Sequence, residues 1–141
     1  MNYAMLSCSA QERFNNLPII FIFAFSKEQF AEKLAEGCKS IGVTDPKTEL
    51  SSIGGGGYIK RTDLHLFRDV CDANEKERNE FLSDMNNLEE AFLYELGNHE
   101  YCITYNDAET WEAVGLDPKT ATLEQQGAYA DARSEYLSQE H

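Results

Sequence analysis

One uninterrupted apolar run, LPIIFIFAF over residues 17–25, constrains the fold more than any other part of the sequence. A helix that spans a bilayer needs about 20 apolar residues, so this run is too short to cross a membrane. It also lies behind a polar stretch, too far from the start of the sequence for a signal peptide. Its β-branched and aromatic residues predict a buried strand over Ile19–Phe25.

A helix signal follows this strand directly. Residues 26–29 have the spacing of a capping box, in which Ser26 and Gln29 accept hydrogen bonds from the free N–H groups at a helix start. We predict a helix from Lys27 to Glu36 that ends at Gly37, because glycine is common just beyond the last helical residue.

The remaining patterns predict an α+β fold in one compact domain, residues 1–141. Short alternating segments predict two more strands, so we expect a small three-stranded sheet, antiparallel or mixed, covered by helices. The predicted strands are 19–25, 58–60 and 100–105, and the other predicted helices are 3–16, 63–71, 81–96, 106–114 and 122–139. In the first of these helices we expect core contacts from Met5, Leu6 and Phe14, and Gly115 should end the helix over 106–114.

The predicted C-terminal helix has only a thin apolar stripe. Leu123, Ala130 and Leu137 repeat at heptad spacing, with Tyr129 and Tyr136 beside them. Because so few residues form the stripe, we expect residues 122–141 to be a peripheral helix.

Charge is distributed unevenly along the sequence. Residues 1–68 contain eight basic and seven acidic residues, whereas residues 69–141 contain four basic and 18 acidic residues. Nearly all of the net charge of −13 therefore belongs to the second half. A strongly acidic surface repels nucleic acids and membranes and attracts basic surfaces, so we expect a basic protein partner and no direct binding to nucleic acid or membrane.

The acidic residues repeat along a predicted helical stretch from Asp63 to Leu96. Such a stretch rises about 1.5 Å per residue, so its most acidic part would span roughly 36 Å, comparable to one turn of B-DNA at about 34–36 Å. An array of that length would replace nucleic acid in a channel lined by Lys and Arg. The predicted partner-binding residues are Asp69, Asp72, Glu75, Glu77, Glu80, Asp84, Glu89 and Glu90. An ordinary solvated face that keeps an acidic protein in solution is the alternative.

A run of four glycines is the second candidate site. The run exposes backbone N–H groups, two cations follow it, and a helix start is predicted at Thr62, all of which suit a phosphate. The spacing differs from a P-loop, in which Gly directly precedes the Lys and Ser or Thr directly follows it. The run also suits a flexible or bulged connection that passes close to a neighbouring element. The candidate phosphate-binding residues are Gly54, Gly55, Gly56, Gly57, Lys60 and Arg61.

The sequence contains no strong catalytic or metal-binding signature. Glu95, His99 and Glu100 cluster near a predicted helix end, but they lack a fourth ligand, and a His in this position is typical of a helix-dipole contact. No G-x-S-x-G motif is present. We therefore predict no catalytic residue, metal or cofactor, and keep a small hydrolase as an alternative.

The four cysteines indicate a cellular compartment. Cys8, Cys38, Cys71 and Cys102 are widely spaced and form no C-x-x-C pair. We interpret them as reduced, mostly buried thiols of a cytoplasmic protein, because disulfides are rare in that compartment.

In its size, its one-sided charge and the acidic array of residues 69–100, the chain resembles the small acidic inhibitors made by phages and other mobile elements, including anti-CRISPR and anti-restriction proteins. It departs from a pure nucleic-acid mimic because residues 1–68 are nearly neutral and carry the glycine run. The resemblance implies a non-enzymatic protein that binds and inhibits a bacterial defence effector, either a basic nucleic-acid-binding protein or a ribonucleoprotein. Binding of a phosphorylated small molecule by the glycine loop remains the alternative.

Overall fold

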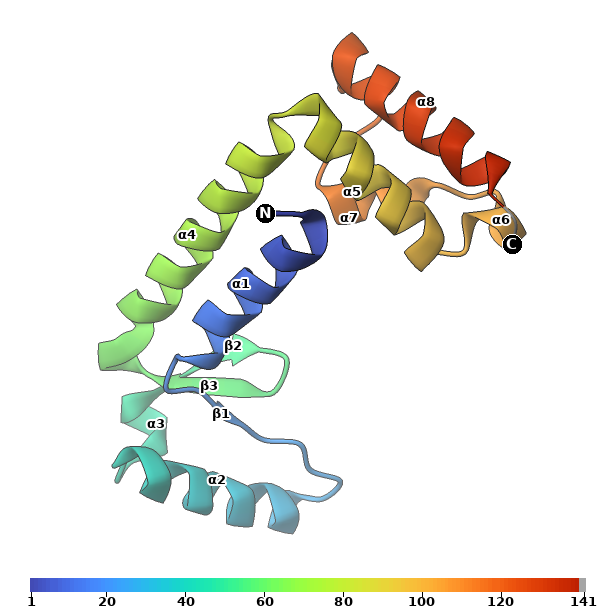
Figure 1. Cartoon of the computed structure of the whole chain (residues 1–141). Coiled ribbons are helices and arrows are strands. Elements are labelled where there is room, and N and C mark those ends of the chain that lie inside the picture. The colour runs from blue at the N-terminus through green and yellow to red at the C-terminus, as the bar shows by residue number, and fades with distance from the viewer. Residues whose placement is uncertain (140–141) are drawn as a thin grey trace. The chain divides into compact units, whose positions relative to one another are not determined.

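The computed structural model describes residues 1–139 and shows an α+β fold with a three-stranded antiparallel sheet, which confirms the predicted fold class (Figure 1). The chain divides into two compact units. We call residues 1–8 and 75–141 the helical unit and residues 9–74 the sheet unit. Helices α1 (Tyr3–Asn15) and α4 (Leu64–Leu82) contribute residues to both units. The assignment of residues 1–141 to a single domain stays a prediction.

The helical unit is built around α5, which packs against both α7 and α8. Phe92 on α5 is fully buried, and its ring lies 4.7 Å from that of Trp111 and 5.2 Å from that of Tyr129. The helices of this unit are α5 (Met85–Asn98), α6 (Tyr101–Thr104), α7 (Ala108–Val114) and α8 (Leu123–Ser138). Its core comprises Tyr3, Leu6, Phe81, Leu88, Ala91, Phe92, Leu96, Tyr101, Trp111, Val114, Ala128, Ala132 and Tyr136.

Helix α8 packs through a different face from the predicted one. Thr122 and Gln125 form a capping box at its start, but Leu123 is 86% exposed and Leu137 is also exposed. The buried side chains are Ala128, Ala132 and Tyr136, at positions four residues apart, and only Tyr136 among them was expected to pack. The small alanines let α8 lie close to α5, so the predicted heptad stripe is wrong and the helix is packed along its length.

The sheet unit has strand order β1-β3-β2, with both pairs antiparallel. Its second, smaller core comprises Cys38, Val43 and Leu50, with Ile20, Leu34, Ile41 and Tyr58 packed against them. The elements are β1 (Ile20–Phe21), α2 (Lys27–Ile41), α3 (Pro46–Glu49), β2 (Leu50–Gly54), β3 (Gly57–Lys60) and the 3-10 turn η1 (Arg61–Asp63). Neither α3 nor β2 is predicted from the sequence, and η1 includes Thr62, which is therefore not the predicted helix cap.

The predicted buried strand over residues 19–25 is wrong in both length and burial. Only Ile20 and Phe21 pair with β3, and Phe23 and Phe25 are 64% and 102% exposed. Ile22 alone among the later residues is buried, because its N–H donates to Gly56 O at 2.8 Å and holds it against the hairpin.

Helix α2 begins as predicted and ends later. Ser26 accepts a hydrogen bond from the Gln29 N–H, and Gly42 ends the helix with a left-handed φ of 73°. Gly37, the predicted end, lies inside α2, where a Cβ would come within 2.8 Å of Ile20 Cδ1. Gly37 therefore serves close packing of the helix on β1 and not termination.

The predicted strand over residues 100–105 is a single helical turn, α6. Glu100 and Tyr105 flank it with positive φ values of 53° and 52°. Only Tyr101 is buried, and its hydroxyl accepts a hydrogen bond from Arg133 Nε at 2.9 Å. Tyr101 packs against α8, and this contact outweighs the alternating pattern of the sequence. Ile103 and Tyr105, which the pattern placed on the same face, are exposed as a result.

The acidic stretch is not one continuous helix. Helix α4 ends at Leu82, and α5 begins at Met85 after the N-cap residue Asp84, whose carboxylate accepts hydrogen bonds from the Asn86 and Asn87 N–H groups. The predicted roughly 36 Å array needs about two dozen residues in one unbroken helix, whereas α4 has 19 residues, so this part of the prediction is wrong.

None of the helices among residues 1–139 is both long and apolar enough to cross a membrane.

All four cysteines are free thiols. The prediction that they are mostly buried is wrong, because Cys8 and Cys71 are exposed and only Cys38 is buried.

Candidate functional site

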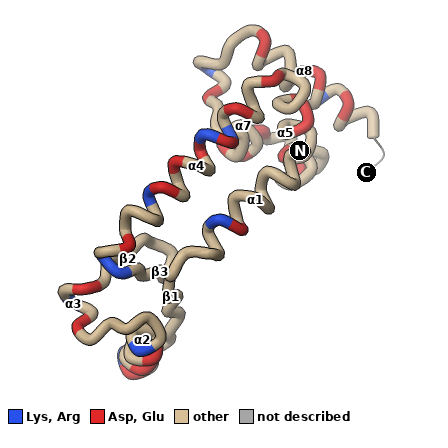
Figure 2. Tube along the Cα trace, turned by 60° about the vertical axis from the view of Figure 1, so that its left-hand side comes forward, with Lys and Arg blue, Asp and Glu red and all other residues tan. Residues whose placement is uncertain are grey.

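The predicted partner-binding residues lie on two helices and the link between them. Five of them are on α4, and Asp69, Asp72, Glu75 and Glu80 are exposed there, whereas Glu77 is half-buried. Figure 2 shows that acidic and basic residues alternate along α4. Lys76 lies four residues from both Asp72 and Glu80, so a cation interrupts the acidic face of this helix.

Two of the predicted residues have structural roles. Asp84 caps α5, and Glu90 Oε1 accepts a hydrogen bond from the Tyr3 N–H at 3.1 Å. Glu89 is half-buried on α5. The structure therefore leaves Glu75 and Glu80 as the predicted residues that are exposed in the helical unit and free of these roles.

The acidic character belongs to the whole helical unit rather than to one helix. Residues 1–8 and 75–141 contain 16 acidic and four basic residues, whereas residues 9–74 contain nine acidic and eight basic residues. Acidic positions recur on α5, α7 and α8 (Figure 2). Exposed acidic residues of this unit thus extend beyond the predicted array, and include Glu109, Glu112, Asp117, Glu124, Asp131 and Glu135.

The four glycines form the turn of the β2–β3 hairpin. Gly55 and Gly56 have φ values of 59° and 79°, as a type I′ loop requires at both central positions. A Cβ on Gly56 would lie 3.0 Å from Ile22 O, and the β2–β3 register shifts between Ser52 and Gly54. A bulged connection with a close backbone approach is therefore what these glycines form.

The two cations of the candidate phosphate site lie away from the glycine turn. Lys60 ends β3, three residues beyond Gly57, which is about 10 Å along an extended strand. The Arg61 guanidinium donates to Leu50 O at 3.2 Å and to Lys47 O at 3.5 Å. The structure does not bring the cations and the glycine N–H groups together, and phosphate binding stays a prediction.

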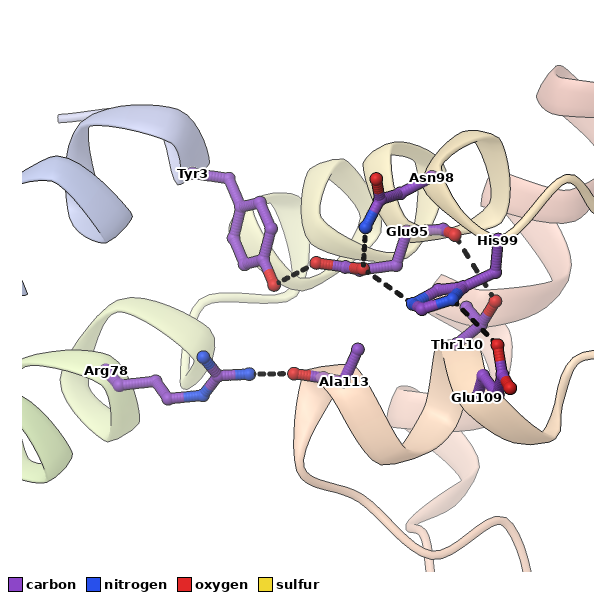
Figure 3. A network of polar contacts seen from close by, with 8 residues as sticks. All are labelled: Tyr3, Arg78, Glu95, Asn98, His99, Glu109, Thr110 and Ala113. Atoms are coloured by element: carbon purple, nitrogen blue, oxygen red, sulfur yellow. Dashed lines mark hydrogen bonds and ion pairs between the residues drawn. The ribbon is translucent and has the colours of Figure 1, made fainter. Parts of the chain in front are cut away.

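His99 belongs to a polar network that joins three helices of the helical unit (Figure 3). Its Nδ1 lies 3.0 Å from Glu109 Oε2 on α7. Its Nε2 lies 3.1 Å from Glu95 Oε2, although the two atoms are not aligned for a hydrogen bond. A His with a carboxylate beside each ring nitrogen is positioned for ion pairing when it is protonated.

Glu95 is the buried centre of this network. Its Oε1 accepts a hydrogen bond from Tyr3 Oη at 2.7 Å, and its Oε2 accepts one from Asn98 Nδ2 at 3.4 Å. Burial and the hydrogen bond to Glu95 raise the pKa of Tyr3 to about 12, so the phenol stays protonated and remains a donor. No pattern in the sequence links Tyr3 to Glu95, because 92 residues separate the two.

The network is suited to holding helices together. The side chains beside His99 are carboxylates and not a Ser or Cys nucleophile, so the geometry offers no pair for nucleophilic attack. Among residues 1–139, no group of three His, Cys, Asp or Glu side chains is placed to hold a metal ion. Glu100, the third member of the sequence cluster, is exposed at the start of α6.

A comparison with known families finds one match. The sequence model of one family, described as a family of unknown function (DUF7659), matches residues 2–133. The chain belongs to this family. The match includes residues of both units. No curated protein and no solved structure matches the chain.

Proposed function

We propose that this protein is a non-enzymatic inhibitor that binds a nucleic-acid-handling defence effector, with the acidic surface of the helical unit occupying a basic nucleic-acid site. The partner is a basic nucleic-acid-binding protein or a ribonucleoprotein. The proposal implies that the protein acts in the cytoplasm of a bacterium or of an infected host cell, where such effectors work.

The observation that carries the proposal is the charge of the helical unit, which contains 16 acidic and only four basic residues. Charged surfaces steer association at distances up to the Debye length, about 8 Å at physiological salt. A channel lined by Lys and Arg to bind phosphates offers the complementary charge.

The packing of the helical unit also supports the proposal. Its acidic side chains are carried by helices that share one extensive core, centred on Phe92. A rigid array loses little conformational entropy on binding, so more of the electrostatic attraction appears as affinity. The exposed Glu75 and Glu80 are favourable contact residues, because neither caps a helix.

The test is competition between this protein and nucleic acid for purified effectors. A fluorescent duplex bound to a Cas-type ribonucleoprotein or to a restriction enzyme should be displaced by the protein, and displacement should weaken between about 50 and 500 mM salt. We expect the double variant Glu75→Lys/Glu80→Lys to displace the duplex about tenfold less effectively, with an unchanged melting temperature.

The double variant Glu28→Lys/Glu32→Lys is the matched control, because it makes the same change of charge on exposed positions of α2 in the sheet unit. It should compete like the wild-type protein. If both double variants lose activity equally, net charge and not the helical unit governs binding. If the wild-type protein displaces nucleic acid from none of the effectors, inhibition of this kind is ruled out for them.

A further inference from the structure

The helical unit contains an open groove of about 470 Å³ beside the end of α7. Its apolar surface comes from Ala108, Trp111, Leu116 and Pro118, and its polar residues are Glu112 and Asp117. A volume of this size falls in the range of ligand sites, about 300–1,000 Å³. The groove therefore has an apolar floor and carboxylates along its border.

The chain turn that shapes this groove is firmly held. Gly115 has a φ of 85°, and its N–H donates to Glu112 O at 3.0 Å. The Leu116 N–H donates to Trp111 O at 3.1 Å, which completes a Schellman motif and packs Leu116 against the core. The floor is thus formed before any ligand binds.

The segment that shapes the groove is acidic, and two cations lie beside it. Residues 107–118 contain four acidic residues and no Lys or Arg, and Lys119 follows at the edge. Glu112 and Asp117 are exposed, and Asp117 Oδ1 also accepts a hydrogen bond from the Lys119 N–H at 2.8 Å. Arg78 on α4 approaches the same turn from another helix and donates to Ala113 O.

We propose that this groove anchors a basic peptide segment of a partner, in which an apolar side chain fills the floor and flanking Lys or Arg side chains pair with Glu112 and Asp117. An apolar centre with a polar rim is the usual anatomy of a protein interface. Long cationic side chains suit the border because their stems cover apolar surface while their charges reach the carboxylates. The inference rests on the proposed function and names the contact point within it.

The experiment uses the full-length protein and an unlabelled peptide with a central Leu-Leu pair flanked by Arg and Lys. Trp111 is the only tryptophan in the sequence and lines the groove, so its intrinsic fluorescence reports occupancy by a peptide that lacks Trp. The same peptide with Ser in place of Leu tests the apolar anchor. We expect it to bind about tenfold more weakly, because the serine side chain buries almost no apolar surface on the floor.

Two variants with equal loss of charge separate the groove from general attraction. Glu112→Gln/Asp117→Asn removes the rim carboxylates, and Glu124→Gln/Glu135→Gln removes two exposed carboxylates of α8. The rim variant should bind the Leu peptide about three- to tenfold more weakly, and the α8 variant within about twofold of wild type. Circular dichroism and melting temperature establish that both variants are folded.

Equal weakening by both variants, or equal affinity for the Leu and Ser peptides, overturns the groove proposal, since binding is then diffuse electrostatic attraction. That result leaves effector inhibition through Glu75 and Glu80 standing. Conversely, rim-dependent binding of the Leu peptide supports the groove even when the protein displaces nucleic acid from no effector.

Discussion

The helical unit and the sheet unit differ in both charge and core. The helical unit carries 16 acidic and four basic residues around an extensive aromatic core, whereas the sheet unit carries nine acidic and eight basic residues around a core of three buried residues. The more highly charged unit is thus the one with more buried apolar surface. Like charges on a small surface repel one another, so a large core is what allows the helical unit to remain folded.

The sheet unit places its aromatic residues differently. Phe21, Phe23 and Phe25 are all exposed, and the rings of Phe21 and Phe23 stack 6.3 Å apart. In the helical unit the rings of Phe92, Trp111 and Tyr129 pack against one another instead. The comparison predicts that stability resides mainly in the helical unit, and substitutions in both units test this prediction.

The largest effect is expected for Phe92→Ala. Phe92 is fully buried at the centre of the helical unit, so its removal should lower the free energy of unfolding by about 3–5 kcal/mol. Leu34→Ala is the counterpart in the sheet unit and should cost less, because Leu34 is only partly buried. Urea unfolding followed by circular dichroism measures both. A larger loss for Leu34→Ala would reverse the comparison.

Gly56→Ala should destabilise the hairpin of the sheet unit by about 1–3 kcal/mol. The alanine would sit at a φ of 79° with its Cβ 3.0 Å from Ile22 O. Gly127 is the control, because it lies inside α8 where an added Cβ would meet open space, and Gly127→Ala should stabilise by about 0.5–1 kcal/mol. Thermal unfolding should show a lower melting temperature for Gly56→Ala and a higher one for Gly127→Ala. A lower melting temperature for both variants would show that the backbone conformation of the two glycines does not explain their effects.

Tyr3→Phe should destabilise the helical unit by about 1–3 kcal/mol near neutral pH, because buried Glu95 loses a hydrogen-bond donor. The pKa of Tyr3 is raised from 10.0 to about 12, so the folded state holds the proton more tightly than the unfolded state. The contribution is complete below pH 10 and is lost as pH rises through about 12.

The stability difference between wild type and Tyr3→Phe should therefore narrow across that alkaline range. Urea unfolding at a series of pH values measures it. A difference that stays constant to pH 12 would show that folding does not raise the pKa of Tyr3.

The smallest effects on stability are expected for acidic residues, and they should differ between a residue that caps a helix and one that lies on an exposed face. Asp84→Ala removes the N-cap of α5 and should cost about 1 kcal/mol, whereas Asp69→Ala on the exposed face of α4 should change stability by less than about 0.5 kcal/mol. Chemical unfolding of the two variants checks this order. Equal effects would mean that the cap hydrogen bonds at Asp84 contribute nothing measurable.

Local signals in the sequence predicted several features correctly. Ser26 caps α2 and Gly115 ends α7, because such signals act through the backbone of neighbouring residues. The uneven charge also follows from the sequence alone, since charge is a property of composition. The helix over residues 3–16 is confirmed as α1, although Met5, expected in its core face, is exposed.

The candidate site was only partly predictable. The sequence identifies Glu75 and Glu80 as acidic, but nothing in it indicates that Glu90 accepts a hydrogen bond from the Tyr3 N–H, 87 residues away. The cap at Asp84 does have a local signal, an Asp directly before a helix, which the predicted helix over residues 81–96 overlooks. No pattern in the sequence indicates the groove beside α7, because its floor is formed by Trp111 together with residues beyond the end of the helix. The helix stop at Gly115 was visible in the sequence, yet a groove exists only once Leu116 turns back onto the core.

The sequence by itself determined the charge of each segment, the helix caps at Ser26 and Gly115 and the α+β class, because these depend on composition and on residues a few positions apart. Tertiary structure decided which of the patterned residues are buried. Tyr101 packs against α8, and the segment with the alternating pattern is helical. Ile20 packs so closely on α2 that only a residue without a Cβ, Gly37, fits there. Such outcomes depend on contacts between distant residues, whose packing energy exceeds the local preference of the backbone.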